Sequence, residues 1–180
     1  YTSGNIIKSF LSAQGITIKG RVKVATIKKN KKFIFTHKSE PLGNLVKYIN
    51  IYSNNFMTHV LTCQLGVELL DQTRESKQNP CSLGVSAINR FIRKDLGIKT
   101  KYSLFSPSGL SKKNLISSQQ VIHLLEHMAQ NFSVFPEFLN SLPKPGHTGT
   151  LFERFTNKDM QVFKEQIRAK TGSLSTPFTV

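Results

Sequence analysis

Apolar side chains recur every three or four residues along much of this sequence, the spacing that places them on one face of an α-helix. Helices are therefore predicted over residues 4–14, 39–51, 56–66, 85–96, 118–131 and 158–164. Ser117 followed by Gln120 matches a capping box, which fixes the start of the helix that ends near Asn131. Gly66 follows a periodic run and is expected to end the helix before it.

Two other segments are predicted to be extended. Apolar and polar residues alternate in residues 16–36, the period of a β-strand, and four lysines around Asn30 mark the expected tip of a hairpin. Residues 166–174 are expected to form a further strand. Polar residues, prolines and glycines in 71–82 and 143–149 predict loops. Because helices and strands are segregated along the chain, the predicted fold class is α+β.

The composition is that of a globular protein with a basic surface. The chain has 180 residues, 38% of them hydrophobic, and a net charge of +15. It holds no apolar run long enough to span a bilayer. The first acidic residue is Glu40, so lysine and arginine supply the charge of residues 1–39. This charge suits either an anionic polymer or ordinary solvation. Because no aromatic residues are interleaved to stack on bases, a solvated basic face is favoured and nucleic acid is not expected as a partner.

Cys63 and Cys81 are too few for a disulfide framework, and their spacing matches no metal or redox pattern. Cys63 lies in an apolar helical run, so it is expected to be a small buried apolar side chain. A disulfide between the two cysteines, formed in an oxidising compartment, stays open as the alternative.

Two short motifs point to acyl-transfer chemistry. Lys170-Thr171-Gly172 and Ser53-Asn54-Asn55 match Lys-Thr-Gly and Ser-x-Asn, two of the three signatures of serine enzymes that react with penicillin. Each motif alone also has an ordinary explanation. The first fits the end of a strand with an exposed lysine, and the second fits a helix N-cap followed by a turn.

The third signature, Ser-x-x-Lys, has a single match by letter, from Ser141 to Lys144. The chemistry needs this serine and lysine one helical turn apart and facing the same cleft. Pro143 and Pro145 make a helix there unfavourable, and the match follows Ser-x-Asn in the chain instead of preceding it. Ser141 is therefore not expected to be a nucleophile.

Another motif match is His123-Leu124-Leu125-Glu126-His127, which has the spacing of the inverted zinc-protease motif. The two histidines share one face of the predicted helix, and Glu153 or Glu165 stays open as a third ligand. The opposite face is apolar, so the histidines are expected on the ordinary polar face of an amphipathic helix. No metal site is predicted.

Five segments occur in the order typical of one enzyme family: 37–42, 53–55, 108–114, 149–151 and 169–174. On these segments the sequence resembles the D-alanyl-D-alanine carboxypeptidase/endopeptidase family of class C low-molecular-mass penicillin-binding proteins. Two positions depart from the family pattern. Ser106-Pro107 stands where the family has Asp-Gly, and Thr148 stands where it has Asp. The departures put the local loop geometry in question more than the chemistry.

The resemblance implies a serine β-lactamase/transpeptidase-like fold, an antiparallel sheet with flanking helices that is incomplete in this chain. Residues 1–35 are expected to be the end of an inserted accessory domain, and 36–180 the C-terminal part of the catalytic domain. In this family the nucleophilic Ser-x-x-Lys lies far upstream of Ser-x-Asn. We therefore expect it before Tyr1, in a missing N-terminal part of the same protein.

The implied function is a serine D-Ala-D-Ala carboxypeptidase that works through an acyl-enzyme. Endopeptidase activity at the same site stays open as an addition. By resemblance, the catalytic residues are Ser53 as proton relay, Asn55 as a hydrogen-bonding partner of the substrate carbonyl and the missing lysine, and Lys170 as the positive charge. The substrate-binding residues are Thr171, Gly172 and Ser173. The implied substrate is a peptidoglycan peptide ending in D-Ala-D-Ala, and β-lactams are the expected covalent inhibitors.

The resemblance also implies that no metal or organic cofactor is needed, and it implies a periplasmic location. The alternative function is a catalytically inactive relative that serves as a cell-wall binding or scaffold module. A nucleic-acid-binding protein is suggested by the charge alone.

Overall fold

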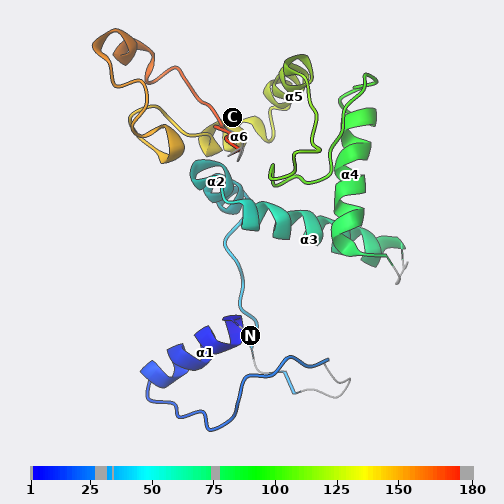
Figure 1. Cartoon of the computed structure of the whole chain (residues 1–180), viewed down its shortest axis with the longest axis vertical. Helices are drawn as coiled ribbons and strands as arrows, with labels where there is room; N and C mark the ends of the chain where they lie inside the picture. The colour runs from blue at the N-terminus through cyan, green and yellow to red at the C-terminus, as the bar shows by residue number, and fades with distance from the viewer. Residues whose placement is uncertain (1, 27–31, 34, 74–77, 175–180) are drawn as a thin grey trace, which may run out of the picture. The chain divides into compact units, whose positions relative to one another are not determined.

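Helices supply the regular secondary structure of the described residues, which are 2–26, 32–33, 35–73 and 78–174 in this computed structural model (Figure 1). The chain divides into two units, Tyr1–Ser39 and Glu40–Val180. The helices, in order, are α1 (Thr2–Ala13), α2 (Leu42–Tyr52), α3 (Asn55–Thr73), α4 (Pro80–Lys94), α5 (Ser118–Gln130) and α6 (Phe135–Ser141), followed by the 3₁₀ helices η1 (Gly149–Leu151) and η2 (Lys158–Phe163).

The first unit consists of α1 and an extended segment. The segment approaches the helix where Gly4 faces Val22, so closely that a Cβ on Gly4 would collide with a Val22 methyl group. Lys8 Nζ donates to the Gly20 carbonyl at 2.8 Å. The helix predicted at 4–14 is thus confirmed, whereas the expected hairpin tip around Asn30 lies outside the described residues.

The α+β fold class with an antiparallel sheet is wrong. Within the described part of the chain, residues 16–26 and 167–174 belong to no strand. One isolated antiparallel bridge joins Ser103 to Leu115. The physical reason is that alternation reports an extended backbone with two different faces, whereas a strand also needs a hydrogen-bonded neighbour. The sequence pattern does not supply that neighbour.

In the second unit, α3 and α4 form a tight pair (Figure 1). A Cβ on Gly66 would collide with the Pro80 carbonyl, and one on Gly84 would collide with the Thr62 carbonyl. The helix expected to end at Gly66 therefore continues through it, because this glycine is required for close packing and does not act as a stop signal.

The start of α4 also corrects a prediction. Asn79 caps this helix, with its side chain accepting from the backbone N–H groups of Cys81 and Ser82. Pro80 occupies the first turn, where its missing N–H costs nothing. Helical structure thus occupies both ends of the expected loop 71–82, whose residues 74–77 lie outside the described part.

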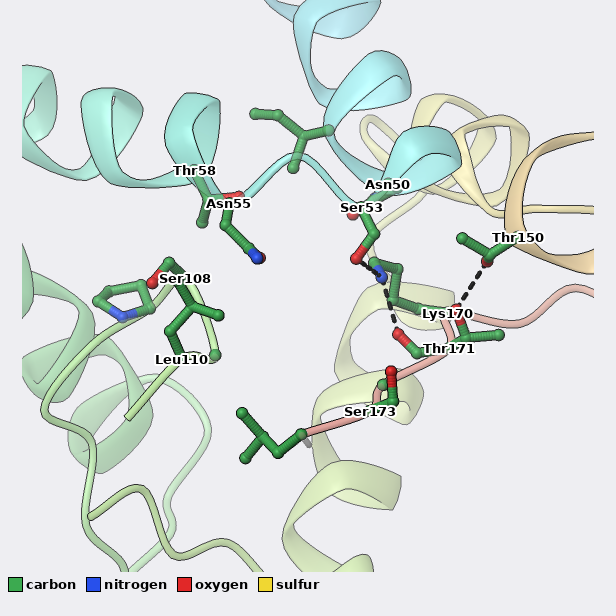
Figure 2. A pocket seen from close by; sticks show the side chains of 15 residues that line it. Asn50, Ser53, Asn55, Thr58, Ser108, Leu110, Thr150, Lys170, Thr171 and Ser173 are labelled. Carbon is green, nitrogen blue, oxygen red and sulfur yellow. Dashed lines mark hydrogen bonds between the residues drawn. The ribbon is translucent and has the colours of Figure 1, made fainter. Parts of the chain in front are cut away.

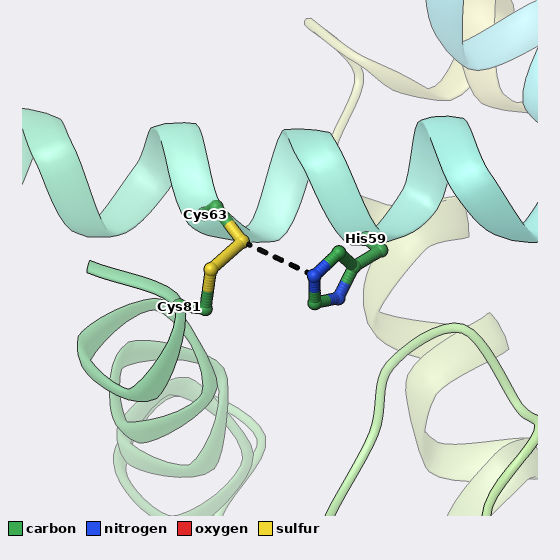
Figure 3. A group of neighbouring side chains, drawn as sticks. All are labelled: His59, Cys63 and Cys81. Atoms are coloured by element: carbon green, nitrogen blue, oxygen red, sulfur yellow. Dashed lines mark hydrogen bonds between the residues drawn. A yellow bond between two sulfur atoms is a disulfide. The ribbon is translucent and has the colours of Figure 1, made fainter. Parts of the chain in front are cut away.

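Cys63 and Cys81 form a disulfide that joins α3 to α4 (Figure 3). The interpretation of Cys63 as a buried thiol is therefore wrong, and the alternative holds. His59 lies one helical turn before Cys63, with its Nε2 3.6 Å from the sulfur. The His59, Cys63 and Cys81 ligand-type atoms lie within 4.8 Å of one another, but both sulfurs are occupied by the disulfide.

Helices α5 and α6 also belong to the second unit and contact each other. The capping box predicted at α5 is confirmed, since Ser117 and Gln120 exchange both hydrogen bonds. Helix α6, which was not predicted, packs along α2, and Asn50 Nδ2 donates to Ser141 Oγ at 2.7 Å. Ile51 and Leu151 are buried between these elements, so the small core of this region lies directly beneath the end of α2.

Candidate active site

Ser53 lies at the C-cap of α2 in the left-handed backbone region, with φ 52° and ψ 47°. Its N–H bonds back to the Ile49 carbonyl, which closes the helix. A non-glycine residue in this region costs about 1–2 kcal/mol relative to right-handed backbone. Such strain persists where the surrounding structure imposes it, and it is concentrated at functional sites. The turn presents the Ser53 hydroxyl beyond the end of the helix (Figure 2).

The next two residues start α3. Asn54 Oδ1 accepts from the Met57 N–H at 2.9 Å, an N-cap bond that fixes the direction of the helix. Asn55 is the first residue of α3, and its side chain lines the same pocket as Ser53 (Figure 2). The helix-cap explanation of this motif is therefore correct for Asn54, while Ser53 and Asn55 remain available to the pocket.

Lys170 reaches Ser53 from the other end of the unit. Its Nζ donates to Ser53 Oγ at 2.6 Å and to the Thr171 carbonyl at 2.8 Å. Much of the side chain is exposed, but partial burial of the ammonium group lowers the pKa of Lys170. The loop expected at 143–149 holds this segment through the Ala169 N–H, which donates to the Pro143 carbonyl at 3.2 Å.

The opposite wall of the pocket is the turn 106–110 (Figure 2). Asn114 fixes this turn, since its Oδ1 accepts from the N–H groups of Phe105 and Ser106 and its Nδ2 donates to the Ser106 carbonyl. Ser106 Oγ lies 2.8 Å from Ser108 Oγ. The departure from the family pattern at Ser106 thus leaves an ordered turn.

Together these elements enclose an open pocket of about 740 Å³. It is lined by all six residues that the sequence singled out, namely Ser53, Asn55, Lys170, Thr171, Gly172 and Ser173. The structure joins Ser53 to Lys170 by a direct hydrogen bond, and the other four line the same space. Lys170 is the charged side chain among the lining residues, so the pocket suits an anionic ligand.

Sequence reasoning missed several residues of this site. Thr150 Oγ1 accepts a hydrogen bond from Thr171 Oγ1 at 2.7 Å, and Asn50, Ser108 and Leu110 also line the pocket. Thr150, Ser108 and Leu110 belong to segments quoted for the family resemblance, so the motifs gave a signal for them. Asn50 had no such signal, because it lies in α2 outside every motif.

Ser141, the serine of the Ser-x-x-Lys match, is buried. Its side chain is fully buried, and Ser141 Oγ donates to the Phe138 carbonyl at 2.7 Å. Helix α6 ends at this residue, so Ser141 and Lys144 are not paired on one helical turn. This serine is hydrogen-bonded to Asn50 of α2 and is not accessible to a substrate.

His123 and His127, the histidines of the zinc-protease match, each contact another side chain. His127 makes an edge-on contact with the Phe91 ring at 5.5 Å, so it packs against α4 and is not on a purely polar face. His123 Nδ1 lies 3.9 Å from Glu126, its neighbour on the helix. Glu165, one of the third ligands left open, instead pairs with His147 at 2.8 Å.

Comparison with known proteins decides the family. Residues 2–178 match the D-Ala-D-Ala carboxypeptidase 3 (S13) family. The chain belongs to this family. The family resemblance drawn from the motifs is thereby confirmed.

Individual relatives of this S13 chain are distant. It is 27% identical over 173 residues to D-alanyl-D-alanine carboxypeptidase DacB of Haemophilus influenzae, covering 96% of the chain and 34% of that protein. It is 27% identical over 139 residues to penicillin-sensitive carboxypeptidase A of Dictyostelium discoideum, covering 76% of the chain and 25% of that protein.

The S13 chain also matches a solved structure, penicillin binding protein 4 (dacB) from Haemophilus influenzae in complex with a β-lactam. The TM-score is 0.73 at 25% identity, with 96% of the chain and 38% of that protein covered. The S13 chain therefore spans a quarter to about two fifths of the length of these relatives.

Proposed function

We propose that the full-length protein containing this chain is a serine D-Ala-D-Ala carboxypeptidase that acts on peptidoglycan peptides through an acyl-enzyme. The observation that carries the proposal is the 2.6 Å contact between Lys170 Nζ and Ser53 Oγ, which joins two motifs 117 residues apart. Family membership and the names of the carboxypeptidase relatives support the same reaction.

Each residue has a role that follows from its chemistry. Lys170 attracts the terminal carboxylate of the substrate and orients the Ser53 hydroxyl, which passes a proton to the departing D-alanine amine. The side-chain amide of Asn55 donates a hydrogen bond to the carbonyl oxygen of the substrate peptide. Thr171 donates its hydroxyl to the terminal carboxylate, and the Ser173 N–H serves as one oxyanion donor. At Gly172 nothing lies within 4 Å of an added Cβ, so the ligand-facing backbone there is open.

The attacking serine is proposed to come from residues that precede Tyr1, in a Ser-x-x-Lys segment. Tyr52 and Phe56 flank the Ser-x-Asn motif and are 68% and 74% exposed. Large apolar side chains at this density beside a polar site are normally covered by other parts of a protein. Coverage by the upstream part would bring its serine to Ser53 and Asn55.

The location is proposed to be outside the cytoplasm, in the periplasm of a bacterium. The Cys63–Cys81 disulfide supports this, because such bonds persist in oxidising compartments. Among the described helices, none has the length and apolar character to cross a membrane. Cleavage of D-Ala cross-links by the same site, an endopeptidase activity, belongs to the same proposal.

The test is intact-mass spectrometry of the full-length protein after incubation with benzylpenicillin. We expect one covalent adduct upstream of Tyr1. Lys170→Ala should slow adduct formation by about 10²–10³-fold, the cost of losing one preorganised charged donor. Lys99→Ala, a change of the same type at an exposed lysine, is the matched control and should leave the rate unchanged. A folded protein that forms no adduct would favour the inactive wall-binding relative.

A further inference from the structure

The Thr150 hydroxyl lies at one end of the pocket and has a defined partner there. Thr171 Oγ1 donates to Thr150 Oγ1 at 2.7 Å (Figure 2). Both side chains line the pocket beside Lys170. The hydroxyl that the proposed function assigns to the substrate carboxylate is therefore engaged with Thr150 in the structure.

The backbone beneath Thr150 is fixed on both sides. Gly149 has φ 59°, and a Cβ there would collide with the Ile51 carbonyl, so η1 lies directly against the end of α2. Leu151 is 2% exposed and its carbonyl accepts from the Gly146 N–H at 3.0 Å. Thr150 thus projects from a short helix whose neighbours on each side are anchored, which gives its hydroxyl a constant position.

The two residues before Thr171 are also fixed by hydrogen bonds. Ala169 bonds to Pro143, and Lys170 bonds to Ser53. The Thr150–Thr171 contact therefore connects two anchored segments, and it does not depend on a mobile side chain reaching across solvent.

A hydroxyl has one proton to donate and two lone pairs that accept, whereas a carboxylate only accepts. Thr171 cannot give its single proton to Thr150 and to a substrate carboxylate at the same time. If the carboxylate takes that proton, the Thr150 contact persists only when its direction reverses, with Thr150 donating to Thr171. Such a chain of donors polarises the terminal O–H and strengthens its bond to an anion.

We propose that Thr150 is a positioning residue for recognition of the substrate carboxylate. In the structure it accepts the Thr171 proton and holds that hydroxyl in place. On binding, it becomes the donor to Thr171, whose proton then goes to the carboxylate. Thr150 itself does not touch the substrate. This inference rests on the proposed function, because that function assigns the carboxylate to Thr171.

The test compares two peptides that differ only in the terminal group, acetyl-D-Ala-D-Ala and its carboxamide. Dissociation constants are measured by calorimetry or NMR titration on the full-length protein with the serine of its upstream Ser-x-x-Lys segment changed to alanine, so that the peptides bind without being cleaved. The wild-type and Thr150 forms named below are compared in this background. The wild-type protein should bind the carboxylate more tightly. Thr150→Val keeps the shape but removes the hydroxyl. It should weaken binding of the carboxylate about two- to tenfold, the worth of one hydrogen bond, and leave the carboxamide unchanged.

Two variants separate positioning from simple loosening of the loop. Thr150→Ser restores the hydroxyl and should restore the preference for the carboxylate. Thr148→Val removes the hydroxyl that accepts from the Lys144 N–H in the same loop. It should lower the melting temperature without changing the ratio of the two dissociation constants. Equal weakening for both peptides in Thr150→Val, or tighter binding of the carboxylate, would overturn the proposal.

The two proposals fail in different ways. If benzylpenicillin forms no adduct but Thr150→Val still lowers the preference for the carboxylate, the enzyme assignment fails and the role of Thr150 stands. If the adduct forms and the preference is the same in Thr150→Val, the role of Thr150 fails alone. A wild-type protein that binds neither peptide contradicts this inference directly.

Discussion

The α3–α4 pair and the Ser53–Lys170 junction are held together by different means. The pair is joined by a disulfide and by two glycines that meet the facing backbone without space for a Cβ. The junction depends on side-chain hydrogen bonds made by Lys170 and Thr171, on a few buried residues beneath them and on one strained serine. The first region is a closely packed scaffold in which a change in shape costs stability, and the second carries polar groups that a ligand can engage.

The largest expected effect comes from removing the Ser53 hydroxyl. Ser53→Ala and Ser53→Gly should both lower the rate of acylation by benzylpenicillin about 10²–10⁴-fold, the usual contribution of a proton relay. Their stabilities should differ. Glycine relieves the left-handed backbone strain and should leave the protein about 1 kcal/mol more stable than alanine does. Urea unfolding beside the acylation rate checks both, and equal stability of the two variants would show that the strain is not borne at Ser53.

Removing the disulfide should affect the scaffold and leave the chemistry intact. The bond closes a loop with a sequence separation of 18. The double variant Cys63→Ser, Cys81→Ser should therefore lose about 3 kcal/mol of unfolding free energy. Acylation of the folded protein should stay within about twofold of the wild type, since the sulfurs do not line the pocket. Reduction of the wild-type protein by a dithiol should reproduce the loss. An acylation defect as large as the stability defect would contradict the separation of the two regions.

Filling the contact between the helices should have a smaller effect. Gly84→Ala places a methyl group against the Thr62 carbonyl, so the two helices must separate, at a cost of roughly 1–3 kcal/mol. Gly43→Ala is the matched control in α2, where an added Cβ would lie 3.7 Å from Glu137 Cγ, an ordinary contact. Because Gly43 lies in the first turn of α2, the change should be neutral or stabilising by less than the roughly 0.5–1 kcal/mol found for glycine in a helix interior. Thermal melts of both variants distinguish packing from helix propensity.

The smallest effect is expected from pH. Partial burial lowers the pKa of Lys170 below the ordinary lysine value of 10.5. The ammonium form attracts the carboxylate, so acylation by a carboxylate-bearing β-lactam should fall as pH rises through this lowered pKa, about tenfold per pH unit above it. The fall should therefore begin at a lower pH than an ordinary lysine would give. A rate profile recorded while circular dichroism shows the protein folded tests this, and a fall that begins only above pH 10.5 would contradict it.

Six of the residues that line the candidate pocket could be predicted from the sequence, because they belong to short contiguous motifs. Ser53-Asn54-Asn55 and Lys170-Thr171-Gly172 each keep their order within a turn or an extended segment, so the letters alone identify them. Helix positions were also well predicted where a local signal was strong, as with Ser117 and Gln120, which exchange their bonds within a single turn.

Tertiary structure alone decided the rest, since those features depend on partners far away in the chain. Gly66 has the same letter whether it ends a helix or lies against Pro80, and only the position of α4 distinguishes the two. Residues 166–174 have the pattern of a strand, but strand pairing needs a hydrogen-bonded neighbour that the pattern cannot identify. The pairing of Cys63 with Cys81 and the meeting of Thr150 with Thr171 follow for the same reason. Local sequence sets which groups are present, and long-range packing sets which of them touch.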